Sequence, residues 1–477
     1  MRIIPLVATI LALSLGAGKV SAHMPHECPD WLPETPAYSG HIGQADILSG
    51  KHDFQIVFEK GRQLFEANFN TCDGQGRPGT TGTGGSRTLD QPRFIRTSAP
   101  DSNSCAGCHA QPRVGGSGDF VANVFVQAQS LHPVTETVSP DFSNERNTLG
   151  MFGSGPIEML AREMSAELQA QLQGLPDGNH RLTTKGVDFE VTIAGGKVVA
   201  SRGVNTDLVI KPFHQSGVVR SIREFTVNAF NHHHGMQAEE RFDLNPNKWR
   251  NPDSDHDGVS RELTIGDITA ATIFQAALAT PGRVMSEDPR ERLQVKQGEA
   301  LFREVGCASC HVPELKLNSP YFVEPNPLNP AGTFNDSRQA FIFDMSKDGE
   351  RPRLERTSDG GAVVRAYTDL KRHNLCDDPD HPDAIRYCCN ERLGQGRPDQ
   401  DGRPGSEFFI TRKLWDVGNS GPYTHRGDLT TITEAILVHG GEGRPSRDRF
   451  VALSPQAQGW IVKFLKTLQV LPRTNTP

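Results

Sequence analysis

The hydrophobic pattern predicts an amphipathic helix near the carboxy terminus, at residues 454–468. Five apolar residues recur there on one face at helical spacing: Trp460, Ile461, Phe464, Leu465 and Leu468. Ser454 is a suitable N-cap, and Pro455 fits the first turn because the backbone nitrogen there needs no intrahelical acceptor. We expect this helix to serve packing and to carry no chemistry.

A pattern of period two occurs at residues 186–210, "GVDFEVTIAGGKVVASRGVNTDLVI". Apolar and polar residues alternate on both sides of Gly195-Gly196, which predicts a β-hairpin with its turn at the two glycines. The other periodic segments are helical and are separated by long loops. The expected fold is therefore mainly α with a small β-hairpin insertion.

An internal repeat divides the chain. "GRQLF" at residues 61–65 matches "GEALF" at 298–302, and "RNTLGMFGSGPIEML" at 146–160 corresponds to "TRKLWDVGNSGPYTH" at 411–425. Each copy of the first phrase has the character of a short helix that leads into a cofactor loop. We therefore predict a duplicated architecture of two similar domains, with bounds 23–290 and 291–477.

The amino-terminal segment, residues 1–22, has the pattern of an export signal. Arg2 supplies positive charge, "IIPLVATILALSL" the apolar run, and Val20-Ser21-Ala22 a small-residue cleavage site. The run is short for a membrane span, and no other stretch approaches 18 apolar residues. We expect cleavage near Ala22, a periplasmic location and no transmembrane anchor.

Composition limits the classes of partner. The 477 residues carry a formal net charge of −7, which argues against nucleic acid as a partner. The 47 Gly and 33 Pro predict long loops. About 455 residues remain after export, enough for two or three domains with substantial cores.

Two copies of the pattern Cys-x-x-Cys-His carry the strongest chemical signal: Cys105, Cys108 and His109, then Cys307, Cys310 and His311. At this spacing two thiols can attach one haem covalently while the imidazole binds its iron. Zinc, a redox dithiol or a disulfide are the alternatives for a Cys-x-x-Cys pair. Only about 0.006 copies of the full pattern are expected by chance from this composition. The pattern therefore predicts two covalently bound haem c groups, one in each of two cytochrome c-like domains.

Five cysteines lie outside these motifs: Cys28, Cys72, Cys376, Cys388 and Cys389. In an oxidising compartment we expect two disulfides and one remaining cysteine. Cys28 with Cys72 would fix the amino-terminal arm, and Cys376 with Cys388 or Cys389 would close a loop. The sequence leaves the connectivity open.

The chain resembles the di-haem oxidoreductases of the bacterial di-haem cytochrome c peroxidase superfamily. The resemblance rests on both haem motifs, the two leading phrases, "REFTVNAFNHHHGMQ", "DGVSRELTIGDITAATIFQAAL" and "GPYTHRGDLTTITEAILVHGGEG". It implies a peroxide-facing haem at the amino-terminal motif and a haem that receives electrons at the carboxy-terminal motif.

The axial ligands are inferred from the motifs and this resemblance. His109 and His311 are the proximal ligands by motif. The related peroxidases place a Met after the carboxy-terminal phrase, whereas this chain has His439 there and its only Met after His311 is Met345. We therefore expect His439 as the second ligand of the carboxy-terminal haem, with a surface or capping role as the alternative. His425 is expected to lie near that haem.

Catalytic candidates lie in "NHHHGMQAEERF", which aligns with the peroxidase segment that carries the distal acid. Three consecutive His cannot share one face of a regular element, so at most one or two can point at one iron. A solvated polar run or a loose metal site is the alternative. The candidates for proton transfer to peroxide are His234 and Glu239, with Glu158 of "GPIEML" behind them. Any His of the run could instead ligate the iron, and His132 and His214 are weaker candidates.

A calcium loop is predicted at "NPDSDHDGVSREL". Its acidic oxygens have the alternation of such a loop, with Gly258 at the bend: Asp253, Asp255, Asp257 and Glu262. Glu262 falls at position ten instead of twelve, so an acidic turn that caps the next helix is the alternative.

The expected function is reduction of hydrogen peroxide, with electrons from a small redox protein that pass from the carboxy-terminal to the amino-terminal haem. A di-haem electron carrier without a substrate and an oxidase of protein or thiol groups are the alternatives. A homodimer is one candidate assembly.

Overall fold

The computed structural model of this protein describes residues 35–76, 102–123, 145–243, 253, 255, 258–387 and 407–470. Helices are its larger elements, and its strands form several small sheets. The predicted mainly α fold is thus confirmed in part, because more β-structure is present than one hairpin. Among the described residues no helix is long and apolar enough to cross a bilayer.

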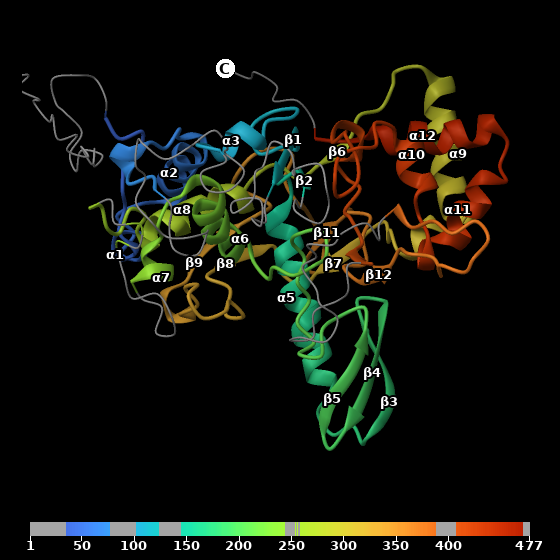
Figure 1. The fold of residues 1–477 in the computed structure, drawn as a ribbon, viewed down its shortest axis with the longest axis horizontal. Helices are drawn as coiled ribbons and strands as arrows, with labels where there is room; N and C mark the ends of the chain where they lie inside the picture. Colours follow the sequence, from blue (N-terminus) through green and yellow to red (C-terminus); the bar gives the residue numbers. More distant parts are fainter. Residues whose placement is uncertain are drawn as a thin grey trace, which may run out of the picture.

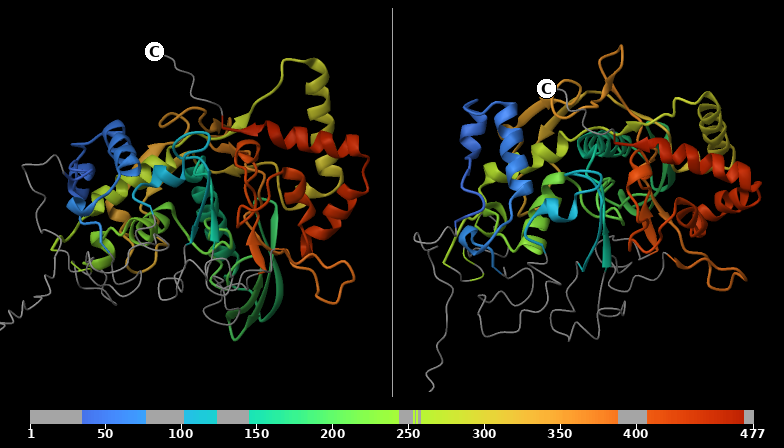
Figure 2. Two further views of the ribbon diagram at one scale, coloured as in Figure 1. Left: turned by 45° about the horizontal axis from the view of Figure 1, so that its top comes forward. Right: turned by 90° about the horizontal axis from the view of Figure 1, so that it is seen from above.

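The helices fall into two groups along the chain. The amino-terminal group comprises α1 (Gln44–Leu48), α2 (Phe54–Glu66), α3 (Cys105–Cys108), α5 (Ser154–Gln171), α6 (Ile222–Ala229), the π-helical turn η4 (Phe230–His234), α7 (Glu239–Phe242) and α8 (Ile265–Ala276). The carboxy-terminal group comprises α9 (Pro289–Glu304), α10 (Ile432–Leu437), α11 (Arg444–Val451) and α12 (Pro455–Thr467). Short 3₁₀ turns lie at η1 (Thr71–Asp73), η5 (Cys307–Ser309), η6 (Ser337–Gln339), η8 (Val417–Asn419) and η9 (Gly441–Gly443). Helices α1, α2, α7 and α8 lie at one end of the molecule and α9 to α12 at the other (Figures 1 and 2).

All strand pairs are antiparallel. Two three-stranded sheets have the orders β3 (Gly178–Thr184), β4 (Val187–Ala194), β5 (Lys197–Arg202) and β10 (Glu355–Arg356), β11 (Ala362–Val364), β7 (Leu315–Leu317). Four further pairs are β1 (Gly118–Asn123) with β2 (Glu145–Thr148), β8 (Tyr321–Glu324) with β9 (Phe341–Asp344), β12 (Arg372–Asn374) with β13 (Phe408–Ile410), and β14 (Leu468–Gln469) with β6 (Gly282–Arg283).

The predicted hairpin is present as β4 and β5, and β3 adds a third strand. Gly195 and Gly196 have positive φ angles of 59° and 71°, which suits glycine at the turn. The inward side chains Val187, Phe189 and Val191 are buried. This sheet projects from the body at the far end of α5 (Figure 1).

The duplicated phrase forms the same element twice. Its first copy lies in α2 and its second in α9. A Cβ atom on Gly61 of α2 would lie 1.9 Å from the carbonyl oxygen of Ala270 in α8, and a Cβ on Gly298 of α9 would lie 1.9 Å from that of Trp460 in α12. Each glycine therefore allows its helix to approach a partner helix closely, α2 on α8 and α9 on α12.

The predicted carboxy-terminal helix is present as α12. The Ser454 hydroxyl accepts a hydrogen bond from the Ala457 amide, and Pro455 lies in the first turn. Ile461 and Phe464 are fully buried. Phe464 contacts Phe302 of α9 at a ring separation of 5.4 Å, so α12 covers the element that leads into the second cysteine motif.

The hydrophobic core forms two clusters of different size. A first cluster joins the amino-terminal helices to strands β7 to β11, through residues such as Phe322 and Val364. A second, smaller cluster consists of α9, α11 and α12 with their neighbours. The buried ion pair of Arg223 in α6 with Glu324 in β8, at 2.9 Å, helps to hold the 315–364 segment against the first cluster.

Cys72 and Cys376 are both disulfide-bonded, whereas Cys105, Cys108, Cys307 and Cys310 are free thiols. The predicted partners Cys28, Cys388 and Cys389 lie outside the described residues, as do the export segment 1–22, His132 and Asp257. The connectivity therefore stays a prediction.

Candidate functional site

The two Cys-x-x-Cys-His motifs have the same local structure. Cys105 and Cys108 bound the helix α3, and Cys307 begins the 3₁₀ turn η5. In each motif the amide of the His donates to the carbonyl oxygen of the first Cys at 2.9 Å. Because residues three apart on one helical turn share a face, both thiols of each pair can reach one group.

Both motif imidazoles are held so that one nitrogen stays available. Nδ1 of His109 donates to the Gly116 carbonyl oxygen at 3.2 Å, and Nδ1 of His311 donates to that of Tyr367 at 3.1 Å. A carbonyl oxygen only accepts, so Nδ1 carries the proton and Nε2 keeps its lone pair. Burial is the main cause that lowers the pKa of each imidazole to about 4. These are the neutral imidazoles that a metal ion requires.

One cavity of about 1180 Å³ is lined by both motifs. Its volume exceeds the roughly 300–1,000 Å³ that is typical of a site for one small molecule. Nine imidazoles line it: His109, His214, His232, His233, His234, His311, His373, His425 and His439. Free thiol pairs, oriented imidazoles and a shared cavity of this size fit two covalently bound haems.

His439 lines the same cavity as the second motif. It follows α10, and its Nδ1 donates to the Ala435 carbonyl oxygen at 2.8 Å, so its Nε2 is also available. Its charge is, after burial, the largest influence that lowers the pKa of His311, so the two imidazoles are close. Met345 is buried in the first hydrophobic cluster and does not line the cavity.

The three consecutive His lie on the π-helical turn η4, a form that occurs often at functional sites. Nδ1 of His234 donates to the Ser102 carbonyl oxygen at 3.0 Å, and its Nε2 lies 3.1 Å from Sγ of Cys105. Both ring nitrogens of His234 therefore contact the first motif's loop. His233 is close enough to His109 to lower its pKa, and burial lowers the pKa of His232 to about 3.

The two predicted acids do not line the cavity. Glu158 lies just behind its wall: its carboxylate accepts from the Ile222 amide at 2.8 Å and from the Asn326 side chain at 3.0 Å, and both Ile157 and Ile222 line the cavity. Burial and the nearby Glu324 raise the pKa of Glu158 to about 8. Glu239 begins α7, at a distance from the cavity lining.

Two of the predicted calcium ligands, Asp255 and Glu262, contact Gln237. Its side-chain amide donates to Asp255 at 3.0 Å and to Glu262 at 2.5 Å, and both carboxylates are buried. Asp253 accepts from the Gly258 amide at 3.3 Å, as in a tight acidic loop. Calcium binding by these residues stays a prediction.

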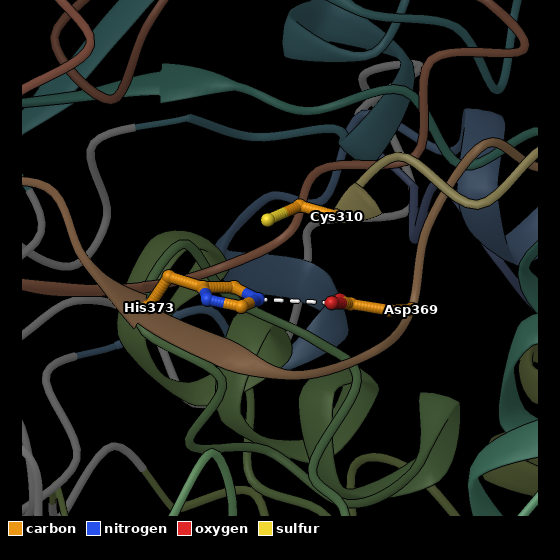
Figure 3. A group of neighbouring side chains, drawn as sticks. All are labelled: Cys310, Asp369 and His373. Atoms are coloured by element: carbon orange, nitrogen blue, oxygen red, sulfur yellow. Dashed lines mark hydrogen bonds and ion pairs between the residues drawn. The ribbon is translucent and has the colours of Figure 1, made fainter. Parts of the chain in front are cut away.

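Sequence reasoning missed an acidic cluster beside the second motif. Nε2 of His373 donates to Asp369 and its Nδ1 to Glu442, both at 2.9 Å. Because both partners are carboxylates, both nitrogens carry protons and the ring is an imidazolium. Cys310, Asp369 and His373 converge within reach of one ion (Figure 3), but Cys310 is already one of the motif thiols. The sequence gives no signal for this cluster, because its residues come from separate segments of the chain and form no recognisable motif.

Sequence reasoning also missed two adjacent cations of the cavity wall, Arg412 and Lys413.

His214 and His425 line the cavity, and burial lowers the pKa of each to about 3. They are therefore neutral imidazoles inside the protein.

Comparison with known proteins identifies one family. Residues 379–468 match the profile of the family described as "Di-haem oxidoreductase, putative peroxidase". The matched range contains His439 and helices α10 to α12, whereas both Cys-x-x-Cys-His motifs lie before it. No curated protein matches the chain.

Solved structures with detectable similarity include hydrazine synthase of Kuenenia stuttgartiensis, at 14% identity and a TM-score of 0.34 over 92% of this chain and 98% of that one. A MauG-like protein associated with microbial copper homeostasis has 14% identity and a TM-score of 0.35, over 93% of this chain and 94% of that one. The diheme peroxidase BthA of Burkholderia thailandensis E264 has 12% identity and a TM-score of 0.34, over 94% of both chains. These three similarities are too weak to support a role for this chain, and the match to the family is confined to residues 379–468.

Proposed function

Because residues 379–468 match the profile of the di-haem oxidoreductase family, we propose that this chain belongs to that family and is an exported di-haem enzyme that reduces hydrogen peroxide. One haem would be attached at Cys105 and Cys108 and one at Cys307 and Cys310. The observation that carries this proposal is the shared cavity, lined by both motifs, in which His109 and His311 keep an available nitrogen.

A bound haem supplies an iron that exchanges single electrons and, where a coordination position is open, the chemistry that cleaves an O–O bond. One H₂O₂, two electrons from a reduced redox protein and two protons yield two waters. The chain itself must hold the proximal imidazoles, provide protons and set the direction of electron flow.

The charges near the two motifs support opposite roles. Arg412 and Lys413 lie on the cavity wall, and the charge of Arg412 acts on His109 of the first motif. At the second motif, the charges of Asp369 and His373 both act on His311. His373 is paired with Asp369 and with Glu442, so two carboxylates face one imidazolium there. A nearby cation favours an added electron and a nearby anion disfavours it. The second motif would therefore receive electrons, with His439 as its second axial ligand, and the first would reduce peroxide.

Proton transfer would fall to groups other than His234. Both ring nitrogens of His234 contact the first motif's loop, so we assign this residue to positioning. His233 lines the cavity near His109 and is the candidate proton carrier at the surface of the cavity. Glu158 behind the wall has a pKa near 8, which lets it release and regain a proton close to neutral pH.

The periplasm is the proposed location. The sequence of residues 1–22 supports export. The disulfides of Cys72 and Cys376 also support it, because such bonds persist mainly in oxidising compartments.

The test uses the exported full-length protein. Its mass should exceed that of the mature chain by two haems, and the half-reduced form should bind cyanide and consume peroxide with a reduced donor. A colourless protein would overturn the whole proposal. If two haems are attached but neither binds cyanide or reacts with peroxide in any redox state, the protein is an electron carrier instead.

A further inference from the structure

Two adjacent cations lie inside the protein on the wall of the cavity. Arg412 and Lys413 belong to the segment between β13 and η8, in the carboxy-terminal half of the chain. Both side chains line the cavity, and burial is the main cause that lowers their pKa values, to about 10 and about 7. Arg412 remains charged at neutral pH.

Arg412 has no counterion in contact. Among the described residues, none forms a hydrogen bond or an ion pair with its guanidinium. Asp416 is the carboxylate whose charge acts on it, but Asp416 instead accepts from the Val470 amide at 3.1 Å. Other cations of the same wall are paired: Arg220 with Glu224 at 3.4 Å, and Arg447 with Asp448 at 3.1 Å.

Lys413 lies beside Arg412 and does not neutralise it. Its Nζ donates to the Phe152 carbonyl oxygen at 3.1 Å and lies 6.0 Å from the Trp415 ring. The Arg412 side chain is exposed on the cavity wall, so a group that fills the cavity would remove it from water, and a cation left there without an anion is costly. The pair therefore marks a place where the cavity requires a negative group.

We propose that the Arg412 guanidinium, with the Lys413 ammonium beside it, binds a carboxylate of the haem attached at Cys105 and Cys108. The proposal rests on the proposed function, since the haem is the group that brings carboxylates into this cavity. The first motif is the partner because Lys413 donates to the Phe152 carbonyl oxygen, next to Met151. The Met151 amide donates to the Gly115 carbonyl oxygen, and the Gly115 amide donates to that of His109, both at 2.9 Å. The planar guanidinium can donate to two carboxylate oxygens side by side, which a lysine cannot. Arg412 is thus a positioning residue that also makes the first site more cationic.

The test compares full-length holoprotein variants by spectroelectrochemical titration and haem content. Arg412→Gln should keep two haems and shift the midpoint potential of the first haem downward, because a neighbouring cation is lost. Arg412→Lys keeps the charge, so its first haem should have a midpoint potential close to that of the wild type. Arg447→Gln, which removes a cation already paired with Asp448, should leave the first haem's potential unchanged. A Cys105→Ala/Cys108→Ala variant identifies which signal belongs to the first haem.

A structure of the wild-type holoprotein gives a readout that does not depend on variant folding. A haem carboxylate within hydrogen-bond distance of Arg412 would support the proposal. Two attached haems with no carboxylate near Arg412, or unchanged potentials in Arg412→Gln, would overturn this inference and leave the proposed function standing. A wild-type protein without haem would overturn both.

Discussion

The ring of Phe65 lies 6.0 Å from the imidazole of His109, centroid to centroid, at an interplanar angle of 50°. Phe302 stands in the same relation to His311, at 6.3 Å and 48°. Each Phe ends the repeated phrase that forms α2 or α9, and each is buried. The duplication thus preserves a contact between the leading helix and the motif imidazole, which helps fix the orientation of that imidazole.

The close approach of α9 to α12 predicts a large effect at Gly298. Its Cβ atom would lie 1.9 Å from the Trp460 carbonyl oxygen, so Gly298→Ala must push the helices apart. We expect a loss of about 1–3 kcal/mol in the free energy of unfolding, measured by denaturant titration. Gly459→Ala on α12 is the matched control, since nothing lies within 4 Å of its Cβ position. That change should stabilise the helix by about 0.5–1 kcal/mol, and equal losses in both variants would contradict the argument.

Removal of the His439 imidazole should leave the iron of the second haem without its second protein ligand. His439→Ala deletes the group that lies close to His311, so the low-spin signal of that haem should become high-spin and its potential should rise. Absorption and electron paramagnetic resonance spectra of the oxidised protein provide the measurement. The control is His381→Ala, an exposed residue outside the cavity lining. An unaltered low-spin signal in His439→Ala would assign the ligand elsewhere.

The proton role of Glu158 predicts a kinetic defect without loss of stability. Glu158→Gln keeps an acceptor for the Ile222 amide but cannot exchange a proton, so peroxide turnover should fall by about 10²–10⁴-fold. Because burial and the nearby Glu324 raise the pKa of Glu158, the wild-type pH profile should have an alkaline limb, and this limb should disappear in Glu158→Gln. Glu163→Gln on the same helix, which pairs with Lys185, should retain wild-type turnover. Normal turnover in Glu158→Gln would remove this residue from the mechanism.

The imidazolium of His373 predicts a pH-dependent contribution to stability. Burial acts to lower the pKa of His373, but hydrogen bonds with Asp369, Cys310 and Glu442 raise it to about 11, above the roughly 6.5 of an unfolded chain. A raised folded-state pKa stabilises the protein fully below pH 6.5 and progressively less as pH rises towards 11. The difference in unfolding free energy between wild type and His373→Gln should therefore be largest near pH 6 and shrink by pH 10. A difference independent of pH would mean that His373 is neutral in the folded protein.

The sequence by itself determined the features that depend on short-range spacing. The Cys-x-x-Cys-His motifs form single helical turns, the two "G-x-x-L-F" phrases form helices, and Gly195-Gly196 forms a hairpin turn. In each case the decisive interactions lie within a few residues, so residue order specifies them directly.

Only the tertiary structure decided which distant side chains meet. Successive residues of a helical turn point in different directions, so the sequence could not tell that His234 turns towards Cys105 while His233 lies near His109. The positions of Arg412, Asp369 and Glu442 at the cavity likewise depend on how separate segments pack. The core shows the same limit, because strands β7 to β11 join the amino-terminal cluster through burial and the Arg223–Glu324 pair, which no local pattern encodes.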